Sequence, residues 1–508
     1  MIPDNTPIIV GVGQFVERLD DPDYLGLAPA DIAARACEAA LADAGVAADA
    51  VDLLGAVRTF EDSRAGPGPF GKPDKFPLAI ARRLGIAPKA AMLEKAGGQS
   101  PLTVIAELAE RLLSGEGRAA LAFGSEAIST VRHLSAQGET RDWAETLEGE
   151  IEDHGPGLEG LLTPYDVKHG LVAAPYAYAM LENARRARLG MSRDAYARAM
   201  GELFAPFTEV AAANPYSSAK AAPMTAGEIA TVGERNRMIA DPYRLKMVSR
   251  DQVNQGAAVL LTTVDAAREM GIAEDKWLYL HGAAWASEPP IVERSDPAAY
   301  PAARLALEAA LASAGKSADD IALFDFYSCF PIAVFSTAVD ILGLAPDDPR
   351  GLTVTGGLPY FGGPGNNYSM HAIATMAERL RASPGDCGLV GLNGGMQTKY
   401  GALVLSTAPR DWPGLAHDDL QRQRARIAGP PTAERAEGDG RVVTYTVIYN
   451  KGVPARAVIV GELATGERFI ANEADAATLD AMLGDDPLGR RVRVVHEDGA
   501  NRFVFAGG

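Results

Sequence analysis

The chain has 508 residues, of which 47% are hydrophobic and 22% are charged, so it can bury several cores. Its formal net charge of −18 argues against nucleic acid or an anionic membrane surface as the main partner, because both would repel it. The three cysteines are too few and too scattered for a disulfide framework or a cysteine-based zinc site, and we expect no metal centre. No uncharged apolar run reaches the ~18 residues of a membrane span and no leader-like segment opens the chain, so we expect a cytoplasmic protein.

The N-terminal part of the chain alternates strand-like and helical runs. An apolar run at 8–13 predicts a strand, and apolar residues at helical spacing predict a helix over 31–44 that Gly45 would cap. Further on, a Gly-Gly-Gln-Ser turn at 97–100 leads into a helix predicted over 102–113. Such a turn brings backbone N–H groups and the positive end of a helix to one point, which suits an oxyanion. The other interpretation is a tight turn that simply needs glycine.

Three later segments differ from this alternation. Residues from about 127 to 240 have no counterpart elsewhere in the chain, and we expect this insertion to form a cap over the site, because loops carry binding determinants on a rigid scaffold. Residues 411–440 are polar, with glycine and proline, and indicate a linker. From 441 to 508, short alternating strands separated by turns predict a small β-barrel-like domain.

Two segments occur twice at nearly the same offset. The octet at 38–45 returns at 308–315 with one difference, Asp43 against Ser313, and Ala-Glu-Arg-Leu at 109–112 returns at 377–380. These offsets of 270 and 268 indicate a duplicated domain, since solenoid repeats run to only about 20–50 residues. We therefore predict an α/β protein with two related halves, 1–270 and 271–410, packed as a layered α/β/α/β/α core.

A set of short motifs occurs in the order found in thiolases, and the chain resembles the thiolase superfamily over residues 5–408. The motifs are the 97–100 turn, Gly-Ser-Glu-Ala at 124–127, Gln-Gly-Ala-Ala at 255–258, Ser-Cys-Phe at 328–330, Gly-Gly-Pro at 362–364 and Asn-Gly-Gly-Met at 393–396. With its β domain the chain is most similar to thiolase-like proteins of type 1, which carry an additional C-terminal domain. The resemblance implies an acyl-CoA ligand with coenzyme A as the substrate moiety, no permanently bound cofactor, and a homodimer.

The residues that define thiolase chemistry are absent from this sequence. Gly98 stands at the position of the nucleophilic cysteine, Gly363 at that of the histidine in Gly-His-Pro, and Gly391 at about that of the second cysteine. Without a thiolate and its base, Claisen chemistry through an acyl-enzyme has no obvious means.

Three residues are candidates to replace them in catalysis. Cys329 lies at the end of a predicted strand, where a thiol can be reached and activated, or it fills the core. Tyr327 stands where the family has a histidine that assists the oxyanion. Its phenol can carry a proton in catalysis, or the side chain serves only to pack the core. His371 reaches the site only if its helix face points inward; a packing role is the alternative. Because side chains two apart on a strand share a face, we expect Tyr327 and Cys329 to line the pocket together.

Further residues are candidates for binding. We expect the substrate to contact Gly98, Gln99, Ser100, Gly363, Asn366 and Asn393. Asparagines in such turns often serve conformation alone, and Ser100 is also a candidate cap for the following helix. Arg185 and Arg186 belong to a cationic group in the insertion and are candidates to bind the phosphates of CoA, although such charges often decorate a solvated helix face.

Three functions remain open from the sequence. The first is an enzyme that acts on acyl-CoA thioesters by acyl transfer, with Cys329 as nucleophile, or by making or breaking a carbon–carbon bond. The second is a retro-aldolase on a β-hydroxyacyl-CoA, with Tyr327 as acid or base. The third is an acyl-CoA-binding protein that kept the pocket and lost the chemistry.

Overall fold

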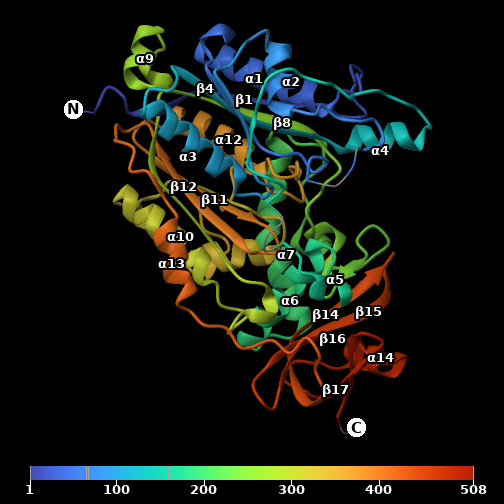
Figure 1. The fold of residues 1–508 in the computed structure, drawn as a ribbon. Helices are drawn as coiled ribbons and strands as arrows, with labels where there is room; N and C mark the ends of the chain where they lie inside the picture. Colours follow the sequence, from blue (N-terminus) through green and yellow to red (C-terminus); the bar gives the residue numbers. More distant parts are fainter. Residues whose placement is uncertain (1, 64–65, 67, 158–160, 507–508) are drawn as a thin grey trace.

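The computed structural model describes residues 2–63, 66, 68–157 and 161–506. Two β-sheets, one from each half of the chain, form the centre of the molecule (Figure 1). The strands of the first half are β1 (Pro7–Val16), β2 (Leu53–Ala56), β3 (Ala90–Leu93), β4 (Ala119–Ala127) and β8 (Asn254–Thr263). Those of the second half are β9 (Leu278–Ser287), β10 (Leu323–Phe326), β11 (Cys387–Gly394) and β12 (Lys399–Ser406). Hydrogen bonding gives the order β10-β11-β12-β9-β1-β8-β4-β2-β3, in which β1 meets β9 only at Ile8 and Ile9.

Helices cover both outer faces of the sheets and fill the space between them. The outer layers are α1 (Pro29–Ala44) and α2 (Phe76–Leu84) on the first sheet and α10 (Pro301–Ala314) on the second. Between the sheets lie α3 (Ser100–Leu113) and α12 (Tyr368–Ala382), which contact both (Figure 1). Short helices α9 (Val264–Glu269) and α11 (Pro331–Val334) connect strands to these layers. The predicted duplicated α/β/α/β/α core is confirmed.

The repeated octet marks the same close contact in each half. A Cβ atom added at Gly11 of β1 would lie 2.2 Å from the carbonyl oxygen of Ala40 on α1, and one added at Gly282 of β9 would lie 2.1 Å from that of Ala310 on α10. Both helices therefore approach their strand so closely that only glycine fits on the strand and only small residues fit on the helix. This packing accounts for the alanine-rich repeat.

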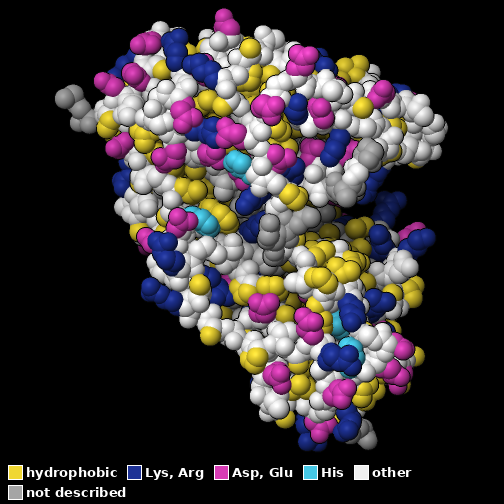
Figure 2. Space-filling model, viewed as in Figure 1, with side chains coloured by type: hydrophobic (Ala, Val, Ile, Leu, Met, Phe, Trp, Pro, Cys, Tyr) yellow, Lys and Arg dark blue, Asp and Glu magenta, His cyan; other side chains and the backbone are white. Residues whose placement is uncertain are grey.

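The insertion contributes mainly helices. Its elements are α4 (Ile128–Ala136), β5 (Glu152–Asp153), α5 (Pro164–Lys168), α6 (Ala174–Arg188), α7 (Arg193–Ala213), α8 (Ala226–Ala230) and β6 (Met238–Ala240), followed by β7 (Tyr243–Arg244). Strand β5 pairs in parallel with the outer edge of β3. Hydrophobic side chains gather on the surface over α5 (Figure 2), where Leu162, Val167 and Val172 are exposed.

The C-terminal domain is a closed β-barrel, as predicted. Its strands are β14 (Gly438–Asn450), β15 (Val453–Leu463), β16 (Arg468–Glu473), β17 (Arg491–Glu497) and β18 (Ala500–Phe505), with one helix, α14 (Ala476–Gly484). They follow the order β15-β16-β18-β17-β14, and pairing of β14 with β15 closes the ring. Strand β6 of the insertion adds to this sheet where Ala240 pairs with Ile448. The insertion and the barrel are therefore one packed unit.

The segment predicted as a linker is more ordered than its composition indicates. It holds β13 (Leu415–Ala416), which pairs with β9, and α13 (Asp418–Ala425), which packs against α10. Leu420 and Arg424 give the otherwise polar α13 a buried face. None of the helices in the described part of the chain has the length and apolar character that crossing a bilayer requires.

Candidate functional site

The turn before α3 meets the end of β10 at Gly98. A Cβ atom added at Gly98 would lie 2.5 and 2.6 Å from Cε2 and Cζ of Tyr327, and 2.0 Å from the carbonyl oxygen of Asn393. The phenol ring therefore fills the space into which a cysteine side chain at this position would extend. The neighbouring family positions are also closed: a Cβ at Gly363 would lie 2.3 Å from Oγ of Ser249.

Tyr327 presents a hydroxyl group that no described residue engages by a hydrogen bond. Its backbone N–H donates to the carbonyl oxygen of Gly391 at 3.0 Å, and its ring meets that of Tyr368 edge-on with centroids 5.3 Å apart. Within the described residues the hydroxyl has no hydrogen-bond partner, although the side chain is only 8% exposed. Burial, and next the nearby Cys329, raise the pKa of Tyr327, so the phenol stays neutral and can donate a hydrogen bond.

Cys329 lies beside Tyr327 as a buried neutral thiol. Asn393 Nδ2 is 3.8 Å from its sulfur, and burial raises the pKa of Cys329 to about 12 against smaller lowering effects of Tyr178 and Asn393. The groups that bond the sulfur are uncharged, so nothing here prepares a thiolate. Strand β10 ends at Phe326, earlier than the predicted extended run through Cys329. The argument that Tyr327 and Cys329 share one strand face therefore loses its basis, and that they line a pocket together stays a prediction.

Tyr178 is a site residue that the sequence interpretation missed. It projects from α6 of the insertion, accepts a hydrogen bond from Asn393 Nδ2 at 2.9 Å, and donates to the carbonyl oxygen of Gly395 at 3.3 Å. Its ring packs on Phe330 with centroids 4.5 Å apart. The helix is predictable from its periodicity, but no local signal tells which of its residues faces a loop more than 200 positions away.

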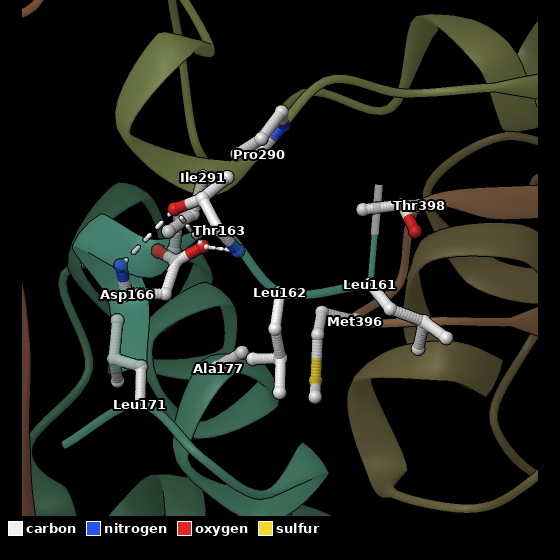
Figure 3. Close-up of a pocket in the computed structure, with 10 residues that line it drawn as sticks. All are labelled: Leu161, Leu162, Thr163, Asp166, Leu171, Ala177, Pro290, Ile291, Met396 and Thr398. Atoms are coloured by element: carbon white, nitrogen blue, oxygen red, sulfur yellow. Dashed lines mark hydrogen bonds between the residues drawn. The ribbon is translucent and has the colours of Figure 1, made fainter. Parts of the chain in front are cut away.

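An apolar pocket lies between the insertion and the second half (Figure 3). It is lined by Leu161, Leu162, Thr163, Asp166, Leu171, Ala177, Pro290, Ile291, Met396 and Thr398. Ala177 precedes Tyr178 in the chain and Met396 follows Gly395, but neither Tyr327 nor Cys329 is among the lining residues. The cavity measures about 20 Å³, room for a single water, and an acyl chain would enter only if its walls moved apart.

His371 does not join the candidate catalytic residues. It is fully buried on α12, where its Nδ1 lies 2.8 Å from Oε1 of Gln14 and its ring packs against Phe361. Burial lowers the pKa of His371 to about 3, so the imidazole is neutral. No contact joins it to Tyr327 or Cys329 in the described structure. The prediction of a catalytic role is therefore corrected to a packing role.

Two predicted binding residues hold the turn and do not face a ligand. Asn366 accepts from the N–H of Gly97 at 2.9 Å through Oδ1 and donates to the carbonyl oxygen of Arg58 at 2.7 Å through Nδ2, so both ends of its amide are engaged. Ser100 is fully buried and donates to the carbonyl oxygen of Lys95. The predicted cap is wrong as well, because α3 begins at Ser100 itself.

Of the other predicted binding residues, Gln99 and Asn393 keep one free acceptor each. Gln99 Oε1 and Asn393 Oδ1 are buried and have no hydrogen-bond partner among the described residues. Gly363 packs against Ser249, Arg250 and Leu358, and no contact links it to Gly98 or Tyr327 among the described residues. The structure thus brings Gly98, Tyr327 and Asn393 together and leaves Gly363 aside.

Arg185 and Arg186 are structural residues, which corrects their predicted role with CoA. Both Arg185–Asp340 bonds measure 2.7 Å, and Arg186 meets Asp486 of the barrel at 2.7 and 2.9 Å. The two residues are 5% and 2% exposed. They lie on the face of α6 that packs against the second half and the barrel, so neither is available to a phosphate.

Glu182 lies one turn after Tyr178 on α6 and is fully buried. Its carboxylate accepts hydrogen bonds from the hydroxyls of Tyr196 and Tyr243, at 2.5 and 2.8 Å. Burial raises the pKa of Glu182 to about 7, against the lowering effect of these bonds and of Arg185. This carboxyl group therefore holds a proton through much of the range below neutral pH.

Glu182→Gln is expected to remove part of the pH dependence of stability. The folded-state pKa of Glu182 lies above its unfolded value, so the native state binds the extra proton and loses stability as the pH rises through about 7. The glutamine mimics the protonated acid and gives no such loss. Urea unfolding from about pH 5 to pH 8 should show the free energy of unfolding of the variant rising relative to that of the wild type as the pH rises. A difference in unfolding free energy that stays constant over this range would contradict the raised pKa of Glu182.

One group of metal-type ligands is partly buried, with Glu94 buried and Glu107 and His154 half-buried. Ligand atoms of Glu94, Glu107 and His154 are within 4.8 Å of one another. His154 Nδ1 is 3.1 Å from Oε2 of Glu94, and Glu107 is paired with Arg111 at 2.8 Å. The hydrogen bond to Glu94 raises the pKa of His154, which favours the charged imidazolium beside these carboxylates.

One family model matches the C-terminal part of the chain, and a solved structure matches its full length. Residues 419–500 match the thiolase-like protein type 1 additional C-terminal domain. A crystal structure described as a monomeric SCP2-thiolase-like protein type 1 from Mycobacterium smegmatis is 41% identical, with 100% of both chains covered and a TM-score of 0.85. The chain belongs to the thiolase-like proteins of type 1. The predicted resemblance is confirmed.

More distant structures share the core fold of this type 1 thiolase-like protein. Acetyl-CoA acetyltransferase from Syntrophomonas wolfei is 15% identical, covering 79% of this chain and 100% of its own, with a TM-score of 0.55. Human mitochondrial 3-ketoacyl-CoA thiolase is 16% identical, and the match covers 80% of this chain and 100% of the thiolase with a TM-score of 0.57. An Ltp2-ChsH2(DUF35) aldolase is 19% identical, and the match covers 80% of this chain and 98% of that chain with a TM-score of 0.58. These likenesses show the fold alone. No curated protein matches the chain.

The homodimer implied by the resemblance is not supported for this type 1 thiolase-like protein. The relative from Mycobacterium smegmatis is described as monomeric. In this chain, β5 pairs with β3 at Met92 and Leu93, so a second copy cannot add a strand there without displacing it. We expect light scattering to give the mass of one chain, 53.4 kDa, and twice that mass would contradict this expectation.

Proposed function

We propose that the protein binds β-hydroxyacyl-CoA thioesters and breaks or forms a carbon–carbon bond by aldol chemistry, with Tyr327 as the proton carrier. The observation that carries this proposal is the unengaged hydroxyl of Tyr327, whose ring fills the space of the family nucleophile at Gly98. Acyl transfer through Cys329 is less well supported, because that thiol is neutral and has no base beside it.

The proton balance of the cleavage suits a phenol with a raised pKa. As the Cα–Cβ bond breaks, its electrons shift to Cα, which takes the phenol proton of Tyr327. In the same step the phenol oxygen takes the proton of the β-hydroxyl, and the β-carbon becomes the carbonyl carbon of the product. Because the two transfers are concerted, Tyr327 forms neither an oxonium ion nor a free phenolate, and negative charge develops on the thioester oxygen in the transition state.

Charge on the enolate oxygen needs hydrogen-bond donors. The backbone N–H groups of Gly98 and Gln99 precede α3 and have no acceptor among the described residues. They lie at the positive end of that helix, where a developing oxyanion is stabilised. In the proposed site these N–H groups would stabilise the oxyanion while Tyr327 carries the proton.

The apolar surroundings suit the acyl chain. The pocket in Figure 3 is lined mainly by aliphatic side chains, and Leu162 at its rim belongs to the exposed hydrophobic surface over α5. Aldolase chemistry on a related core, as in the Ltp2-ChsH2(DUF35) aldolase, agrees with the proposal. The acyl-CoA itself is inferred from the thiolase relatives.

The decisive experiment is incubation with a panel of β-hydroxyacyl-CoA thioesters, followed by mass spectrometry of both products and protein. The proposal expects a shorter thioester and a carbonyl product, with no mass added to the protein. An acyl adduct on Cys329, absent from Cys329→Ala, would establish acyl transfer and overturn the proposal. Binding without turnover of any thioester would establish the non-catalytic alternative.

A further inference from the structure

A second cavity lies beside α7 and shares no lining residue with the pocket in Figure 3. The buried residues Thr208, Ala211 and Tyr360 line it, and the exposed Ala212 and Arg250 line it where it opens to solvent. Its volume is about 140 Å³. An apolar cavity of about 150 Å³ accommodates a benzene ring, so this one has room for a group of about six carbon atoms.

The walls of this cavity are mostly apolar. Five alanines, a methionine and a proline contribute most of the lining. The two hydroxyl groups in the lining already have partners. Thr208 Oγ1 donates to the carbonyl oxygen of Ala205 at 2.7 Å and accepts from the N–H of Met224 at 2.9 Å, and Tyr360 donates to the carbonyl oxygen of Lys246 at 3.0 Å. The walls therefore favour a hydrocarbon group.

Arg250 brings a positive charge to this lining. Its Nε donates to the carbonyl oxygen of Gln252 at 3.3 Å, and neither Nη atom has a hydrogen-bond or ion-pair partner within the described part of the chain. Asp251, the next residue, pairs instead with Arg132 at 2.9 Å. Partial burial of the guanidinium lowers the pKa of Arg250 more than Asp20, which forms no ion pair with it, raises it. The charge at the opening thus lacks a close counter-charge.

We propose that this cavity binds a small apolar monocarboxylic acid, whose carboxylate meets Arg250 at the opening and whose hydrocarbon part fills the space beside Ala211 and Tyr360. A guanidinium presents parallel N–H groups that match the two oxygens of a carboxylate. A phosphate or a dicarboxylate would bring a second negative charge to apolar walls that offer no second cation among the lining residues.

Occupancy would stabilise a segment that reaches the candidate site. The backbone N–H of Arg250 donates to the carbonyl oxygen of Leu358 at 3.1 Å, and its carbonyl oxygen accepts from the N–H of Gly363 at 2.8 Å. The N–H of the preceding Ser249 donates to the carbonyl oxygen of Cys329 at 2.9 Å. A ligand on Arg250 therefore holds the backbone that joins Cys329 to the 358–363 loop. The cavity stands on its own observations and does not depend on the aldol proposal.

Benzoate and hexanoate are the probes, and benzamide and hexanamide are their neutral counterparts of similar shape. In calorimetric titrations of the full chain, at least one acid should bind at least tenfold more tightly than its amide, because only the carboxylate gains charge-assisted hydrogen bonds. Acetate, which has the charge without the hydrocarbon part, should bind at least tenfold more weakly than that acid. Equal affinity for acid and amide, or no binding of either acid, would overturn the proposal.

Two variants with matched controls place the ligand. Arg250→Gln should lower the affinity for the acid at least tenfold and leave that for the amide unchanged, while Arg198→Gln, the same charge change at an exposed residue of α7 outside the lining, should alter neither. Ala212→Leu fills the opening and should abolish binding of both compounds, while Ala213→Leu, at the next exposed position and outside the lining, should not. Acid binding that survives either Arg250→Gln or Ala212→Leu would overturn the proposal.

Discussion

Tyr327→Phe is expected to lower the cleavage of β-hydroxyacyl-CoA by about 10²–10⁴-fold, the usual contribution of a positioned proton carrier. The change deletes one hydroxyl that bonds to nothing in the described protein, and the ring remains to fill the space beside Gly98. Stability should therefore stay within about 0.5 kcal/mol of the wild type. Single-turnover assays with product analysis, together with urea unfolding, measure the two quantities separately.

Cys329→Ala is the matched control for that variant. It removes the neighbouring thiol, which is neutral and bonded only to uncharged groups, and should retain most of the turnover. Loss of activity in Cys329→Ala with full activity in Tyr327→Phe would reverse the roles and favour acyl transfer. Full activity in both would assign the chemistry to neither residue.

The fold was largely predictable because its information is local and repeated. The two octets, the glycines after them and the period-two strands near the C-terminus each fix an element without knowledge of distant contacts. What local patterns could not give is that β6 joins the sheet of the barrel, because pairing of Ala240 with Ile448 depends on both segments being brought together by the fold.

The candidate site was predictable only in part, for a related reason. Motif order located Gly98, Tyr327 and Asn393, which do meet, but it could not show that a tyrosine ring occupies the vacant cysteine space. Arg185 and Arg186 looked like surface cations because helical periodicity cannot distinguish a solvated charge from a buried one whose partner lies far along the chain. Their partners, Asp340 and Asp486, are more than 150 positions away.

The shared sheet gives the additional domain a structural role in the site. Asn183 on α6 donates through Nδ2 to the carbonyl oxygens of Asp241 and of Tyr445 on β14, at 2.9 and 3.1 Å. The same helix carries Tyr178 into the cluster around Cys329. The barrel therefore braces the helix that carries Tyr178.

Gly98→Cys, which restores the family nucleophile, is expected to destabilise the protein by about 3 kcal/mol or more, at the upper end of overpacking effects. The new Cβ would collide with the Tyr327 ring at 2.5 Å and with the Asn393 carbonyl oxygen at 2.0 Å. Adding Tyr327→Ala removes the ring and leaves the backbone carbonyl in place, so the double variant should recover only part of the loss.

Gly233→Cys, at a glycine with nothing within 4 Å, is the matched control and should change stability by less than about 0.5 kcal/mol. Urea unfolding of these variants gives the coupling between positions 98 and 327 as a double-mutant cycle. A Gly98→Cys protein with wild-type stability would show that the ring yields easily, and the filled cysteine space would then no longer argue against acyl-enzyme chemistry.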